Sequence, residues 1–90
     1  MSYNGWENYE TWNVSLWLNN EPDTYYALCE ILSNNEDDYE AGKLIQSLVE
    51  DMNPLAEDAS MFSDMLSAAL HEVDWQEIAR SNREDIESEE

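Results

Sequence analysis

The sequence has few residues that bend or cross-link a chain. It contains two glycines and two prolines in 90 residues. A β-sandwich or barrel needs turn residues about every 8–12 positions, so this scarcity argues against a loop-rich β protein. Cys29 is the single cysteine, which excludes an internal disulfide bond and is typical of a protein in a reducing compartment.

Basic residues are nearly absent. Three Lys and Arg face 22 Asp and Glu, which gives a formal net charge of −19. Phosphate groups repel such a chain, so direct binding to nucleic acid or to an anionic membrane is excluded. The charge instead favours a cationic protein partner, with fast and salt-sensitive association.

Long apolar runs are also missing. No segment approaches the roughly 20 apolar residues of a membrane span, and residues 1–5 do not resemble the start of a secretion signal. We therefore expect a cytoplasmic protein that does not enter a membrane.

Aromatic and aliphatic residues are present in helical spacing almost throughout. A first helix is expected over about 9–18, with Asn8 as its cap. Asn19, Asn20 and Pro22 end it and begin a second helix. The stripe of this second helix is formed by Tyr25, Leu28, Cys29 and Leu32.

Two further apolar stripes, both expected to face the core, predict helices in the second half of the chain. The first ends at Asn53-Pro54, and Asp74 is expected to cap a fifth helix, with Glu77 in a capping-box relation to it. Residues 1–90 therefore form one all-α domain, a compact bundle of four to five short helices, with 84–90 as a frayed acidic tail. The two stripes are Ala41, Leu44, Ile45, Leu48, Val49 and Met52, and then Phe62, Met65, Leu66, Ala69, Leu70 and Val73.

The acids become denser after residue 35, since residues 1–35 hold only five of the 22. Glu36 and Glu40 are expected one helical turn apart, about 6 Å. Phosphates of one DNA strand advance about 3.4 Å per nucleotide along the axis, so carboxylates on helices can approximate a phosphate row. The candidate partner-binding acids are Glu36, Asp37, Asp38, Glu40, Glu50, Asp51, Glu57, Asp58, Asp74, Glu77, Glu84 and Asp85.

Groups that carry out catalysis are sparse. His71 is the only histidine and has no nucleophile beside it, and Cys29 is interpreted as a buried structural thiol. The acidic run at 37–42 fails as a calcium loop, because Tyr39, Ala41 and Leu48 would occupy ligand positions. We expect a protein that is not an enzyme and has no cofactor and no metal site.

The aromatic residues near the N-terminus allow a second interpretation. Trp6 precedes the first helix, and Trp12 and Trp17 do not cleanly share one helix face, so one of these two is expected to reach a neighbouring molecule or a dimer partner. Trp6 and Trp12 are therefore candidates for a hydrophobic anchor that contacts a partner or a second copy, although such residues also build cores.

Two sequence blocks resemble those of small bacteriophage and mobile-element proteins: NYETWNVSLWLNN at 8–20 and LSAALHEVDWQEIA at 66–79. The resemblance implies a gene product that acts in the cytoplasm of a host bacterium. Small acidic proteins of that kind include antirestriction and anti-CRISPR inhibitors that imitate DNA, which is an analogy of context. Residues 22–62 show no matching block.

Together these observations predict an inhibitor of a host defence protein that binds nucleic acid. It would occupy a basic groove by nucleic-acid mimicry, and a CRISPR or restriction complex is the expected partner. The alternative is a protein–protein interaction module, or a homodimer, that uses an exposed aromatic patch instead of its charge.

Overall fold

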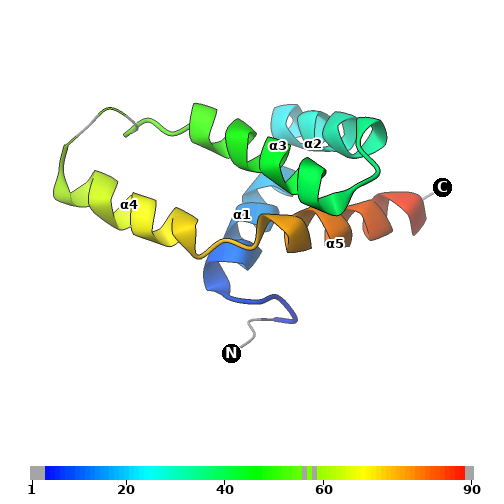
Figure 1. The fold of residues 1–90 in the computed structure, drawn as a ribbon, viewed down its shortest axis with the longest axis horizontal. Helices are drawn as coiled ribbons and strands as arrows, with labels where there is room; N and C mark the ends of the chain where they lie inside the picture. The colour runs from blue at the N-terminus through cyan, green and yellow to red at the C-terminus, as the bar shows by residue number, and fades with distance from the viewer. Residues whose placement is uncertain (1–3, 56, 58, 89–90) are drawn as a thin grey trace.

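The computed structural model describes residues 4–55, 57 and 59–88. These residues form five α-helices and no strand, so the prediction of an all-α domain of four to five short helices is confirmed. The helices are α1 (Tyr9–Asn20), α2 (Pro22–Asn34), α3 (Asp38–Asp51), α4 (Met61–His71) and α5 (Trp75–Ser88). Figure 1 shows their arrangement.

The helix boundaries follow local capping chemistry. The Asn8 side chain accepts a hydrogen bond from Thr11 N at 2.9 Å, as predicted for the start of α1. Pro22 occupies the first turn of α2, where its missing N–H leaves no partner unsatisfied. α4 begins with a capping box between Ser60 and Ser63.

The start of α3 differs from the expected one. Asp37 is its N-cap and accepts a hydrogen bond from Tyr39 N at 3.2 Å. Glu36 therefore precedes the helix, and the predicted one-turn spacing between Glu36 and Glu40 is wrong. The physical reason is that the Asp37 carboxylate satisfies a backbone N–H that has no partner inside the helix.

α3 and α5 pack closely and run antiparallel, and α1 and α2 contribute further residues to the core. Gly42 lies against the first turn of α5: a Cβ placed there would be 3.0 Å from Gln76 N and from Trp75 C. The absence of a side chain thus lets the two backbones approach. The buried apolar residues are Leu18, Leu28, Leu32, Ala41, Ile45, Val73, Ile78 and Ala79.

A row of polar side chains joins α1 to α5. Thr11 Oγ1 donates to Asn8 Oδ1 at 2.6 Å and accepts from Asp74 N at 2.9 Å. One turn further on, the buried Asn82 amide donates to Ser15 Oγ at 3.2 Å and accepts from Asn19 Nδ2 at 2.8 Å. The positions 8, 11, 15 and 19 are spaced by three or four residues, so they share one face of α1.

α4 lies outside the closely packed group formed by α1, α2, α3 and α5. In Figure 1 it runs from the left of the view to the start of α5, on the side away from α2 and the C-terminus. Phe62 and Met65 are 65% and 63% exposed, so the prediction that they belong to a buried stripe is wrong. The pattern correctly predicts a helix, but none of the other helices in the described part of the chain packs closely against α4.

The start of α5 confirms Asp74 as a cap, because its carboxylate accepts from Glu77 N at 3.0 Å. The reciprocal contact of the predicted capping box, from the Asp74 backbone N–H to the Glu77 side chain, does not form, so this part of the prediction is wrong. Glu77 Oε1 accepts instead from Glu7 N at 2.9 Å, and Asp74 N donates to Thr11. α5 includes residues 84–88, the first part of the segment in which fraying is expected, and 89–90 lie outside the described residues.

Candidate functional site

The fold brings six of the candidate acids to one end of the molecule, where the α2–α3 junction meets the end of α5 (Figure 1). The contact that joins these segments is an ion pair, Arg83 Nε to Asp38 Oδ1 at 2.9 Å. We call this group the acidic end. Its members are Glu36, Asp37, Asp38, Glu40, Glu84 and Asp85, all exposed except the half-buried Asp38.

The basic residues at the acidic end are engaged with the protein itself. Arg83 is 19% exposed, and its guanidinium also donates to the carbonyl oxygens of Leu32 and Asn35. These are the last carbonyls of α2 and its C-cap, which have no partner within the helix. Lys43 is 3.6 Å from Glu40 and lies over the Tyr39 ring. The acidic end thus keeps a strong excess of negative charge.

A second group of acids lies at the other end of α3. Glu50 and Asp51 are in its last turn, and Glu57 is in the α3–α4 connection; all three are exposed. The 13 residue steps from Asp38 to Asp51 correspond to about 20 Å along the helix. This exceeds the roughly 8 Å Debye length at physiological salt, so the two groups act separately on a ligand.

The remaining candidate acids have other positions. Asp74 and Glu77 are half-buried. The Asp74 carboxylate caps α5 by accepting from Glu77 N, and the Glu77 carboxylate joins α5 to the N-terminal segment by accepting from Glu7 N. They hold the fold together, and they do not extend either acidic group. Asp58 lies outside the described residues.

The two candidate anchors, Trp6 and Trp12, are both half-buried. Trp6 packs against the core cluster, and the Trp12 ring lies 5.6 Å from the Tyr9 ring. The most exposed tryptophan among the described residues is Trp17, at 59%. Trp17 is not one of the two predicted anchors, and helical spacing alone does not distinguish an exposed aromatic residue from one in the core.

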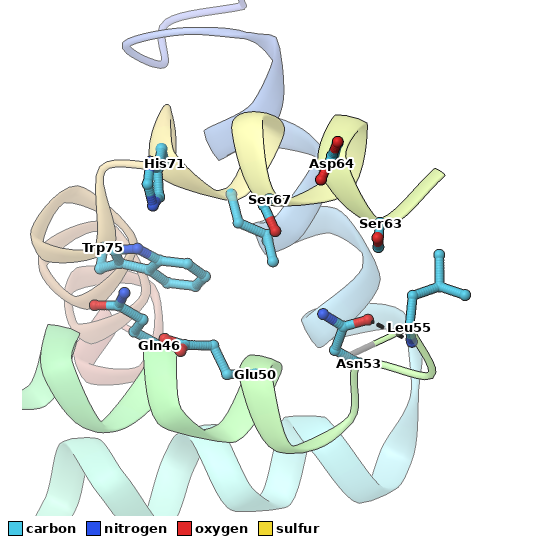
Figure 2. A pocket seen from close by; sticks show the side chains of 10 residues that line it. Gln46, Glu50, Asn53, Leu55, Ser63, Asp64, Ser67, His71 and Trp75 are labelled. Carbon is cyan, nitrogen blue, oxygen red and sulfur yellow. Dashed lines mark hydrogen bonds between the residues drawn. The ribbon is translucent and has the colours of Figure 1, made fainter. Parts of the chain in front are cut away.

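A polar cleft of about 400 Å³ separates the second half of α3 from α4. Figure 2 shows Gln46 and Glu50 on α3, His71 on α4, and the Trp75 ring directed into the opening. His71 is exposed. Among the described residues, no group of three His, Cys, Asp or Glu is placed to hold a metal ion.

A family model described as "Family of unknown function (DUF7249)" matches residues 1–89. The chain belongs to DUF7249. In this member of DUF7249, the two blocks at 8–20 and 66–79 contact each other directly: Asn8 Nδ2 donates to Glu72 O at 2.6 Å, and Asp74 N to Thr11 Oγ1. The block residues that make these contacts thus have a structural role.

No curated protein matches the chain, and no solved structure matches it. The description of DUF7249 assigns no activity, and the resemblance to bacteriophage proteins stays a prediction. Of the helices in the described part of the chain, none has the length and apolar character required to cross a bilayer.

Proposed function

We propose that the protein binds a basic, nucleic-acid-binding protein through the acidic end and excludes nucleic acid from it. One observation carries the proposal: two segments distant in sequence, 36–40 and 84–85, converge there with six carboxylates. The two cations closest to them, Lys43 and Arg83, are paired with Glu40 and Asp38. Arg80 lies one turn before Glu84 on α5. When it is counted with Lys43 and Arg83, the six acids of the acidic end still outnumber the bases two to one.

The physical basis is the cost of gathering like charges. Each carboxylate added to such a group raises the self-repulsion of a small domain with only about 5–15 kcal/mol of stability. A cationic groove relieves that repulsion when it binds, and the same groove attracts nucleic acid through its phosphates. A ligand of this kind therefore competes with nucleic acid for the same Lys and Arg side chains.

The target class in this proposal is a host defence complex, of the CRISPR or restriction type, in the cytoplasm of a bacterium. The resemblance of the blocks at 8–20 and 66–79 to bacteriophage and mobile-element proteins supports that choice. The acidic end supports only the coarser part, which is a cationic partner.

The test begins with capture of partners from a bacterial lysate at low salt, followed by purification of any captured nucleic-acid-binding protein. That partner is then titrated with labelled nucleic acid in the presence of the acidic protein. We expect competitive displacement, with affinity that falls steeply as salt rises. The variant E36Q/E84Q should weaken binding about tenfold, because both carboxylates are exposed at the acidic end.

The matched control is E7Q/E72Q, which removes the same charge from two exposed glutamates far from the acidic end. It should bind almost as tightly as the wild-type protein. Simultaneous binding of nucleic acid and the acidic protein to the partner, or affinity independent of salt, would refute the proposal.

A further inference from the structure

An apolar groove lies between α1 and α4, away from the acidic end. Its volume is about 280 Å³, and its floor is formed by the end of α3 and the start of the α4–α5 connection. The apolar side chains that define it are Val14 and Trp17 on α1, Val49 and Met52 at the end of α3, and Leu66 and Leu70 on α4.

The apolar stripe of α4 continues beyond this groove. Leu66 and Ala69 line it, and Phe62 and Met65 lie one turn earlier on the same face of the helix. These two side chains are mostly exposed. One part of the apolar stripe of α4 therefore lines the groove, and the other part is exposed to solvent. Exposed apolar surface of this kind is typical of an interaction site.

The opposite wall of the groove is also exposed. Trp17 is 59% and Tyr9 51% accessible, and Met52 is exposed at the end of the floor. Tryptophan and tyrosine contribute a large share of binding energy in protein interfaces. Methionine is flexible and polarisable, which lets a surface adapt to different apolar side chains.

The charged residues in and beside the groove are acidic, which favours a cationic partner. All three basic residues, Lys43, Arg80 and Arg83, lie outside the segments 9–18, 49–52 and 66–73 that line it. Glu10 lines the groove, and Asp51 and Glu72 each adjoin a lining residue. A second copy of this chain would bring another −19 charge to this surface, which opposes self-association.

We propose that this groove binds an amphipathic helix of a partner protein, with apolar residues on one face and Lys or Arg on the flanks. Two helices that border an apolar groove accept a third helix through anchors at i, i+3, i+4 and i+7. The flanking cations would contact the acids beside the groove. This inference does not depend on the acidic end, so each proposal can fail alone.

The probe is a synthetic helical peptide of about 16 residues, made only of leucine and lysine, with leucines at i, i+3, i+4 and i+7. A peptide of the same composition in scrambled order has the same charge and no apolar face. Binding is measured by calorimetry on the full chain. We expect the amphipathic peptide to bind at least about tenfold more tightly than the scrambled one, because only it can fill the groove.

Two variants locate the binding site. W17A removes an exposed side chain from the α1 wall of the groove, and M65A removes one from the α4 stripe where it continues beyond the groove. Each should weaken binding of the amphipathic peptide about five- to tenfold. Y26A is the matched control, because Tyr26 is 70% exposed on α2, outside the groove, and its removal should leave affinity unchanged. Circular dichroism verifies that all three variants fold.

Four results would overturn the inference. The first is equal affinity for the amphipathic and scrambled peptides. The second is wild-type affinity in both W17A and M65A. The third is a dimer in sedimentation experiments that W17A dissociates, since the groove would then hold a second copy. Loss of peptide binding in E36Q/E84Q, with W17A unaffected, would likewise assign the peptide to the acidic end.

Discussion

At the scale of single residues, Thr11 connects parts of the chain that are far apart in sequence. It is fully buried in α1, and its hydroxyl accepts the Asp74 backbone N–H, 63 residues away. The hydroxyl also donates to Asn8, the cap of the same helix. A buried N–H without a partner is costly, so this small side chain stabilises the junction of α1 with α5.

We expect T11V to lower the free energy of unfolding by about 1–3 kcal/mol, because valine keeps the shape and leaves Asp74 N unsatisfied. Chemical denaturation measures this change. T11S is the control, since it retains the hydroxyl and should cost clearly less. A valine variant as stable as the serine variant would show that the Asp74 N–H finds another acceptor.

Gly42 is the second residue with a distinct role, because it lets α3 and α5 approach each other. Alanine in a helix interior ordinarily stabilises by about 0.5–1 kcal/mol relative to glycine. Here the added Cβ would lie 3.0 Å from backbone atoms of Trp75 and Gln76, which cannot rotate away.

We therefore expect G42A to destabilise the protein by about 1–2 kcal/mol, a reversal of the usual sign. Thermal and denaturant unfolding measure it. S47A, at an exposed position of the same helix, provides the comparison and should be neutral or slightly stabilising. A more stable G42A would contradict the close packing of α3 and α5.

At the scale of elements, α4 differs from the other four helices. Its start is secured by the capping box of Ser60 and Ser63, which is a local interaction. Its apolar stripe is only partly covered, and it lies outside the closely packed group. Helices with few buried apolar contacts open at lower free energy than the rest of a domain.

Native-state hydrogen exchange should therefore show α4 opening at a free energy at least about 1–2 kcal/mol below that of α3 and α5. Mass spectrometry of peptides from 61–71 and from 38–51 gives the comparison within one sample. The helix-forming peptide proposed for the groove should raise the protection of α4. Equal protection of α3, α4 and α5 without any peptide would mean that α4 belongs to the same cooperative unit.

At the scale of the whole molecule, the net charge of −19 opposes folding. Ion pairs such as Lys43–Glu40 and Arg83–Asp38 offset part of this charge, but three Lys and Arg cannot neutralise 22 Asp and Glu. Salt shortens the range of the repulsion and should favour the compact state.

We expect the melting temperature to rise by several degrees when sodium chloride is raised from about 20 mM to about 500 mM, because about 1 kcal/mol shifts it by roughly 4–8 °C in a domain of this size. Sucrose at matched osmolarity controls for solute exclusion. A melting temperature that falls with salt would mean that the ion pairs at the acidic end outweigh the general repulsion.

The sequence by itself determined the features that depend on neighbours within one or two turns. Asn8, Pro22 and the Asn53-Pro54 pair mark helix ends through their own hydrogen-bonding groups or ring, and apolar residues spaced by three or four predict helices. The all-α class and its short helices follow from these local rules. The excess of acid is likewise a property of composition.

Only the tertiary structure decided which residues meet across the chain. Glu77 bonds to Glu7 instead of completing its capping box, Arg83 binds the end of α2, and Phe62 with Met65 stays exposed on a correctly predicted helix. A helical stripe specifies which face is apolar, but whether another element covers that face depends on contacts between distant segments. The acidic end and the groove arise from such contacts, and periodicity contains no information about them.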